Sequence, residues 1–324
     1  MLVDRTALAR RFADDLGLPA DIGTAPAADT ILTTALAAAL DVLVRVVAVD
    51  VRTDVTALLA PSPPPRADEL RGFVPVAGSW IGVAAVHAGQ RDLVDEVLTD
   101  ADRRCRPVAA VACRLQAMGI AALPAPGIGR PGTRRLRPRP AGAVVQAPGA
   151  PLAGLRVLDL GRLVAGPLAG ALLAALGADV FAVRSPSEAD IRTLDGRREL
   201  ADRLRWADLV VENFSWRGWD QFQQTVGVRP KRHVGVRGFP AESPCRNWKV
   251  YGYLAEAATG LVRGGPRRSG FVAAPDVPVV DRVAGILAAA LAVRALRGDQ
   301  PDATVSLMGV ARSVAAQGRC TDGG

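Results

Sequence analysis

The stretch that decides the fold begins at Leu155-Arg-Val-Leu-Asp-Leu160, an apolar run between Gly154 and Gly161. Small and apolar residues continue from Val164 to Leu176, and Ala178-Asp-Val-Phe-Ala-Val183 is a second short apolar run. Four to eight apolar residues bounded by glycines are typical of a buried strand, whereas a longer small-residue segment is typical of a helix. The stretch therefore predicts a strand, a crossover helix and a second strand.

The same alternation continues toward the C-terminus. Residues 199–206 predict a helix, residues 207–214 a third strand and residues 233–237 a fourth. Further helices are expected over 251–262 and 279–296. Strands that alternate with helices form a parallel sheet with right-handed crossovers. The predicted fold class is therefore α/β, with an open, Rossmann-like parallel sheet.

The N-terminal part of the chain predicts a smaller α/β domain. A strand is expected over 80–86, followed by helices near 90–98 and 107–118. Two further helices are expected before that strand, near 4–16 and from Thr30 onward.

A linker is expected between these two parts. Residues 124–150 are rich in proline, glycine and arginine and have no helix or strand period, a composition typical of an extended connection. The expected domains are therefore a helical segment with the small α/β domain at 1–123, the linker at 124–150, and the sheet domain at 151–324.

Charge limits the classes of ligand. The formal net charge is +8, and Lys231 and Lys249 are the only lysines, so nearly all the positive charge is arginine. Guanidinium groups bind phosphates with two hydrogen bonds, which favours a nucleotide-bearing cofactor or a nucleic acid. Arginine on solvated surfaces explains the same charge. A nucleic-acid binder is the weaker interpretation, because no aromatic platform or recognised motif accompanies the arginines.

The sequence predicts a cytoplasmic protein that holds no metal and enters no membrane. Its first residues lack the apolar core of a signal peptide, and the two most apolar stretches, 30–49 and 279–296, carry central charges that disfavour a membrane span. The cysteines show no spacing typical of a zinc site or a redox dithiol. They are Cys105, Cys113, Cys245 and Cys320.

Five segments, in order along the chain, resemble the class III (CaiB/BaiF-type) CoA-transferase family. They are Pro151–Pro167 with Leu176–Val180, Ala207–Phe214, Gly238–Pro244, Tyr251–Leu261 and Pro278–Asp281. The resemblance implies an acyl-CoA substrate, CoA as the bound group, and an interlocked homodimer or a heterodimer with a paralogue. In the family the small domain usually follows the sheet domain, whereas here it precedes it.

The resemblance also implies a CoA site at the first strand–helix turn. The residues it assigns to CoA are Arg162, Leu163, Val164, Ala165, Arg184 and Asn213. The expectation agrees with the physics of open parallel sheets, which bind anionic ligands where strands end and helices begin. The alternative is that Gly161 and Gly166 only make a tight turn.

The family's catalytic aspartate, which attacks the acyl-CoA thioester, has Gly252 in its place. Glu256 follows about one helical turn later on the same face and is the candidate catalytic carboxylate, with a solvated or salt-bridged residue as the alternative. His87 and His233 lie outside the family's motifs. The predicted function is a CoA transferase with a divergent mechanism; the alternative is a non-catalytic CoA-binding subunit that pairs with an intact paralogue.

Overall fold

The computed structural model describes residues 11, 31–47, 69–76, 78–126, 128, 150–183, 191–261, 272–273, 279–298 and 301–319. Its contacts divide the chain into two compact units. The first, here called the sheet unit, comprises Met1–Leu58, Pro140–Asn247 and Asp281–Gly324. The second, called the small unit, comprises Leu59–Arg139 and Trp248–Val280.

The sheet unit contains a parallel sheet of five described strands in the order β5-β4-β6-β7-β9. All four neighbouring pairs are parallel, so the predicted α/β fold class with an open parallel sheet is confirmed. The strands are β4 (Arg156–Asp159), β5 (Asp179–Ala182), β6 (Leu209–Glu212), β7 (His233–Arg237) and β9 (Asp302–Ser306).

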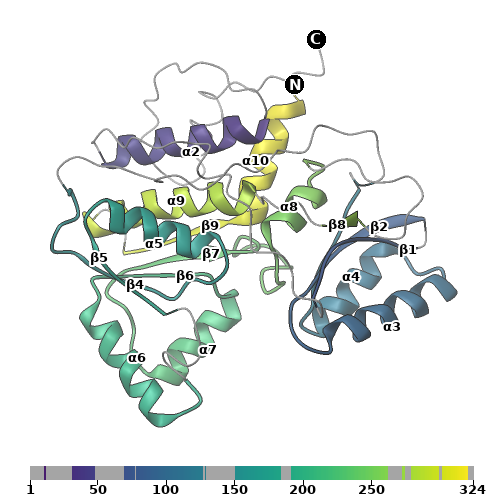
Figure 1. Ribbon diagram of the computed structural model, residues 1–324, viewed down its shortest axis with the longest axis horizontal. Helices are drawn as coiled ribbons and strands as arrows, with labels where there is room; N and C mark the ends of the chain where they lie inside the picture. Colours follow the sequence, from purple (N-terminus) through teal and green to yellow (C-terminus); the bar gives the residue numbers. More distant parts are fainter. Residues whose placement is uncertain are drawn as a thin grey trace. The chain divides into compact units, whose positions relative to one another are not determined.

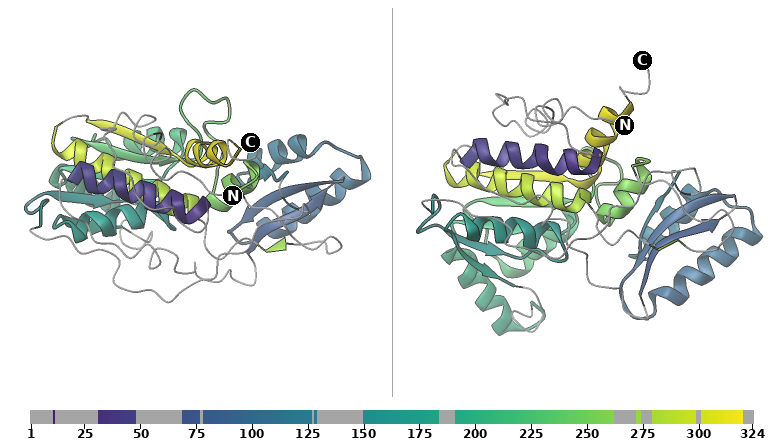
Figure 2. Two further views of the ribbon diagram at one scale, coloured as in Figure 1. Left: turned by 90° about the horizontal axis from the view of Figure 1, so that it is seen from above. Right: turned by 45° about the horizontal axis from the view of Figure 1, so that its top comes forward.

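Helices cover both faces of this sheet (Figure 1). On one face are α6 (Leu194–Trp206) and α7 (Trp216–Val226), which share an apolar core with the strands. On the other are α5 (Ala165–Ala175) and α9 (Val279–Leu296). From Val283 to Val293, α9 is apolar on all sides, in keeping with its being covered: Gly285 leaves room for α5, and α2 (Ile31–Val47) lies along its outer side (Figures 1 and 2). The last helix, α10 (Leu307–Arg319), contacts α2.

The small unit contains an antiparallel sheet in the order β3-β2-β1-β8. Its elements are β1 (Leu70–Val76), β2 (Ser79–Ala85), α3 (Gln90–Arg103), α4 (Val108–Ala117), β3 (Ala121–Pro124), α8 (Gly252–Ala258) and β8 (Val272–Ala273). Ile81 and Val83 point into a core with α3 and α4. Gly82 has the opposite side-chain direction, and there Leu254 of α8 lies so close that an added Cβ would be 2.7 Å away. The small α/β part of the prediction is confirmed.

These units cross the expected domain boundaries. α2 precedes the small unit in the sequence but lies in the sheet unit, and α8 and β8 lie in the small unit. Arg297, just after α9, donates hydrogen bonds to the carbonyls of Val46 and Val47 at the end of α2. The expected domain boundaries follow changes in composition along the sequence, whereas the two compact units depend on which apolar surfaces pack together.

Individual elements differ from the sequence predictions at their ends. α6 begins at Leu194, five residues earlier than expected, because the Thr193 hydroxyl accepts a hydrogen bond from Gly196 and caps the helix. α8 ends at Ala258 rather than at residue 262. The strand β1 and the helices α7 and α10 were not predicted. The helix expected near 4–16 and the linker 124–150 lie almost wholly outside the described residues.

Candidate functional site

The turn from β4 into α5, and the packing of α5 on β4, leave no room for side chains at Gly161 and Gly170. A Cβ on Gly161 would lie 2.5 Å from Cα of Gly166, and one on Gly170 would overlap the carboxylate of Asp159. That carboxylate is fully buried and accepts a hydrogen bond of 2.7 Å from the backbone N–H of Gly161. The turn therefore follows β4 directly, with its backbone N–H groups at the carboxyl end of the strand.

Arg162 and Asn213, which the sequence assigned to one site, lie together. The N–H of Arg162 donates to Oδ1 of Asn213 at 2.9 Å, and Nδ2 of Asn213 donates to the carbonyl of Arg162 at 2.6 Å. The two residues follow the neighbouring parallel strands β4 and β6. This Arg162–Asn213 bridge joins the two strand ends at one edge of the sheet.

The other residues expected at the site occupy the same turn. Leu163 is 59 % exposed and has φ 69°, a left-handed conformation that is strained for a bulky residue. Val164 precedes α5 and Ala165 is its buried first residue. The backbone thus holds an apolar side chain out toward solvent beside the bridge. Arg184 lies outside the described residues.

A hollow of about 420 Å³ is lined by Phe214, the residue after Asn213, together with residues of α7. Phe214 and Phe222 stack with ring centroids 5.3 Å apart. The full lining is Ile191, Phe214, Gly218, Gln221, Phe222, Gln224 and Thr225. These residues were missed because α7 was not predicted; the helical spacing of Trp219 and Phe222 after the capping Ser215 is the signal that reveals it.

Gly252 and Glu256 lie in the small unit, on α8. Gly252 is the buried first residue of the helix, and Glu256 is only 1 % exposed. Oε1 of Glu256 accepts a hydrogen bond of 2.8 Å from the backbone N–H of Val280, the second residue of α9. A carboxylate at the first turn of a helix satisfies an N–H without an intrahelical partner and favours the helix dipole.

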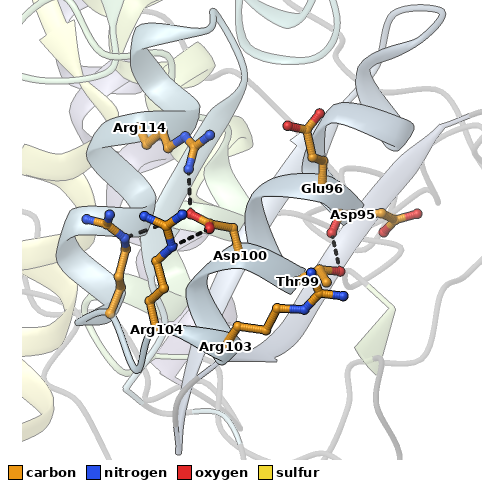
Figure 3. Close-up of a pocket in the computed structure, with 8 residues that line it drawn as sticks. Asp95, Glu96, Thr99, Asp100, Arg103, Arg104 and Arg114 are labelled. Carbon is orange, nitrogen blue, oxygen red and sulfur yellow. Dashed lines mark hydrogen bonds and ion pairs between the residues drawn. The ribbon is translucent and has the colours of Figure 1, made fainter.

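A second hollow, of about 650 Å³, lies in the small unit beside α3 and α4 (Figure 3). Asp100 of α3 forms ion pairs with Arg104 at 2.7 Å and with Arg114 of α4 at 2.9 Å, and Arg106 lies 3.9 Å from it. This network ties α3 to α4, and none of the residues assigned to the site by the sequence lines this hollow.

The described residues add three further findings. His87 is exposed, whereas His233 is buried and bonded to Glu212. Among these residues, no cluster of three or more histidine, cysteine, aspartate or glutamate side chains could hold a metal ion. No helix in the described ranges combines the length and apolarity needed to cross a membrane.

Two curated CoA-transferases are similar to this chain in sequence. Succinate–glutarate CoA-transferase of Agrobacterium fabrum is 26 % identical over 214 residues, which cover 51 % of this chain and 53 % of that protein. Succinyl-CoA–D-citramalate CoA-transferase of Chloroflexus aurantiacus is 29 % identical over 163 residues, or 38 % of this chain and 40 % of its own. The chain thus spans about half, or less, of the length of these relatives.

Among solved structures, a CaiB/BaiF family protein from Brucella suis is 25 % identical with a TM-score of 0.43 and covers 53 % of this chain and 57 % of its own. The family model for CoA-transferase family III matches residues 152–199 and 189–314. The two ranges of the family model together run from residue 152 to residue 314, half of the chain. They contain the β4–α5 turn, the Arg162–Asn213 bridge and α8. The chain belongs to CoA-transferase family III.

Proposed function

We propose that this chain binds the CoA moiety of an acyl-CoA thioester at the carboxyl ends of β4 and β6. The observation that carries this proposal is the Arg162–Asn213 bridge, which joins the β4–α5 turn to the end of β6. Strand ends and helix N-termini in parallel sheets favour anionic ligands. The names of the curated relatives, which are CoA transferases, support the same ligand class.

Two parts of CoA, the base and the phosphates, have candidate partners at this edge. The exposed Leu163 and the partly buried ring of Phe214 offer apolar surface to a planar base. Arg162 offers a guanidinium to phosphate oxygens, and Arg184 is proposed as a second phosphate ligand.

For the chemical step, we propose that the chain is a non-catalytic CoA-binding subunit rather than a transferase acting through Glu256. Gly252 brings no carboxylate to the start of α8, and Glu256 is buried with its Oε1 bonded to Val280. A nucleophile needs access to the thioester carbon, so these observations favour the alternative function. The proposed assembly is a dimer with a paralogue that retains the aspartate, in the cytoplasm.

Calorimetry with CoA tests the binding proposal. Wild type should bind, and Arg162→Ala and Asn213→Ala should each weaken binding about tenfold or more, since a charge-assisted or bridging hydrogen bond is lost. Binding by wild type should also weaken with added salt. Arg205→Ala, on the exposed surface of α6 and paired only with Asp202 in the described structure, is the matched control. The absence of both heat and thermal shift at millimolar CoA would refute the proposal.

Intact-mass measurement after incubation with acyl-CoA tests the chemical step. We expect no covalent adduct on wild type and a new adduct on Gly252→Asp. Glu256→Gln retains an oxygen that can accept from Val280, so it removes the charge but keeps the hydrogen bond. A wild-type adduct that disappears in Glu256→Gln would establish Glu256 as the nucleophile and overturn the non-catalytic proposal.

A further inference from the structure

A buried ion pair lies directly behind the turn that carries Asn213. Glu212 at the end of β6 is 0 % exposed and Arg237 at the end of β7 is 1 % exposed, with Nη1 of Arg237 2.5 Å from Oε1 of Glu212. Nε2 of His233 lies 2.6 Å from the same oxygen. Desolvation makes such pairs poor sources of net stability. Net stability alone is therefore a weak explanation for this charge.

The neighbouring residues are fitted to the guanidinium. His233, Gly235 and Arg237 alternate on β7 and share one face. A Cβ on Gly235 would lie 2.6 Å from Cζ of Arg237, so the guanidinium occupies the space that a side chain at 235 would fill. Trp216 covers it from α7, with Cζ 5.0 Å from the ring centroid. Among the described residues, Nε of Arg237 has no hydrogen-bond partner, which adds to the cost of burying this group.

The ion pair holds the backbone on the far side of Asn213 through two hydrogen bonds. Oε2 of Glu212 accepts from the N–H of Phe214 at 2.6 Å. Nη1 of Arg237 donates to the carbonyl of Phe214 at 3.1 Å. Both backbone polar groups of Phe214 are therefore fixed by charged side chains, and charge-assisted hydrogen bonds are about twice as strong as neutral ones.

We infer that Glu212 and Arg237 are positioning residues that preform the Glu212–Phe214 turn. By fixing Phe214 they orient the Asn213 amide toward Arg162 and set the aromatic wall of the hollow. They contact no ligand themselves, because both are buried beneath the turn. The consequence for affinity rests on the proposed CoA site, whereas the ordering of the Asn213 side chain does not.

The test compares Arg237→Met with Arg156→Met. Arg156 forms an arginine–carboxylate pair with Asp208 in the same sheet, but at the amino end of β4. The direct readout is the side-chain NH₂ signal of Asn213 in the ligand-free protein, identified by its loss in Asn213→Asp and followed by NMR hydrogen exchange. The second readout is CoA affinity by calorimetry, with the thermal midpoint measured in parallel.

Arg237→Met should shift the Asn213 signal, accelerate its exchange and weaken CoA binding about tenfold, because the lost hydrogen bond to Phe214 leaves the turn to be ordered on binding. Arg156→Met should lower the thermal midpoint without changing either the signal or the affinity. If Arg237→Met does not fold, Arg237→Lys takes its place. The ammonium keeps the charge beside Glu212 but lacks the planar fork. This variant should therefore regain more of the wild-type thermal midpoint than of the wild-type protection of the Asn213 side-chain NH₂ from exchange.

The two proposals fail in different ways. If wild type binds no CoA, the proposed function is wrong, and the Asn213 signal alone decides the positioning role. An Asn213 signal that is as protected in Arg237→Met as in wild type would overturn the positioning role, even if CoA binds. Loss of affinity in equal measure in Arg156→Met and Arg237→Met would also overturn it, because the effect would then follow stability alone.

Discussion

Replacing Gly170 with alanine tests whether the close approach of β4 and α5 builds the turn. Gly170 is a helical residue of α5, and a Cβ there would lie 2.9 Å from Cγ of Asp159 and overlap its carboxylate oxygen. The same carboxylate accepts the hydrogen bond from Gly161. The added methyl group should therefore push Asp159 away from Gly161 and open the turn.

The size of the effect follows from three terms. Overpacking a tight core contact costs about 1–3 kcal/mol, and losing a hydrogen bond to a charged acceptor costs about 1.5–3 kcal/mol. The higher helix propensity of alanine returns at most about 1 kcal/mol. The net prediction is a loss of about 1.5–4 kcal/mol in the free energy of unfolding, since partial relaxation of Asp159 reduces the largest sum.

Urea denaturation followed by tryptophan fluorescence measures this loss, because Trp206, Trp216 and Trp219 lie in the sheet unit. The matched control is Gly309→Ala in α10, where the nearest atom to an added Cβ is at an ordinary 3.4 Å. That variant should be neutral or more stable by up to about 1 kcal/mol. If Gly170→Ala is as stable as Gly309→Ala, the close approach of β4 and α5 does not determine the turn.

Three further predictions concern other contacts. Hydrogen bonds from Arg156, with a further one from Lys231, hold the pKa of Asp208 well below its usual value. The ionised carboxylate therefore stabilises the folded state fully above about pH 4, and this contribution is lost as Asp208 becomes protonated at lower pH. Asp208→Asn should thus cost about 1 kcal/mol near neutral pH, and urea titrations should show this difference shrinking in acid; a constant difference would contradict the linkage. Arg297→Met should lower the thermal midpoint, since the end of α2 loses hydrogen bonds worth about 1 kcal/mol; an unchanged midpoint would argue against that contact. Tyr253→Phe should cost about 1–2 kcal/mol in chemical denaturation, because a buried carbonyl of β2 loses its 2.8 Å partner, and a neutral result would show that water replaces the hydroxyl.

The parallel sheet could be predicted because its signals are local. Apolar runs such as 155–160 and 178–183, separated by a small-residue helix, specify strand and crossover without knowledge of any distant residue. The pairing of Arg162 with Asn213 was predictable for the same reason, since the carboxyl ends of neighbouring parallel strands meet at one edge. The ends of α6 and α8 were less predictable, because they depend on caps such as Thr193 rather than on periodicity.

The sequence by itself determined the fold class and the family, and it predicted that Arg162 and Asn213 follow strands that end at the same edge of the sheet. Only the tertiary structure decided that α2 packs in the sheet unit, that Glu256 is buried against Val280, and that Arg237 fits over Gly235 beside Glu212. The spacing of apolar residues along the sequence indicates which residues avoid water, but it does not indicate which surface covers them. The partners of a buried charge or a largely apolar helix come from distant parts of the chain, so their roles are fixed only when the chain has folded.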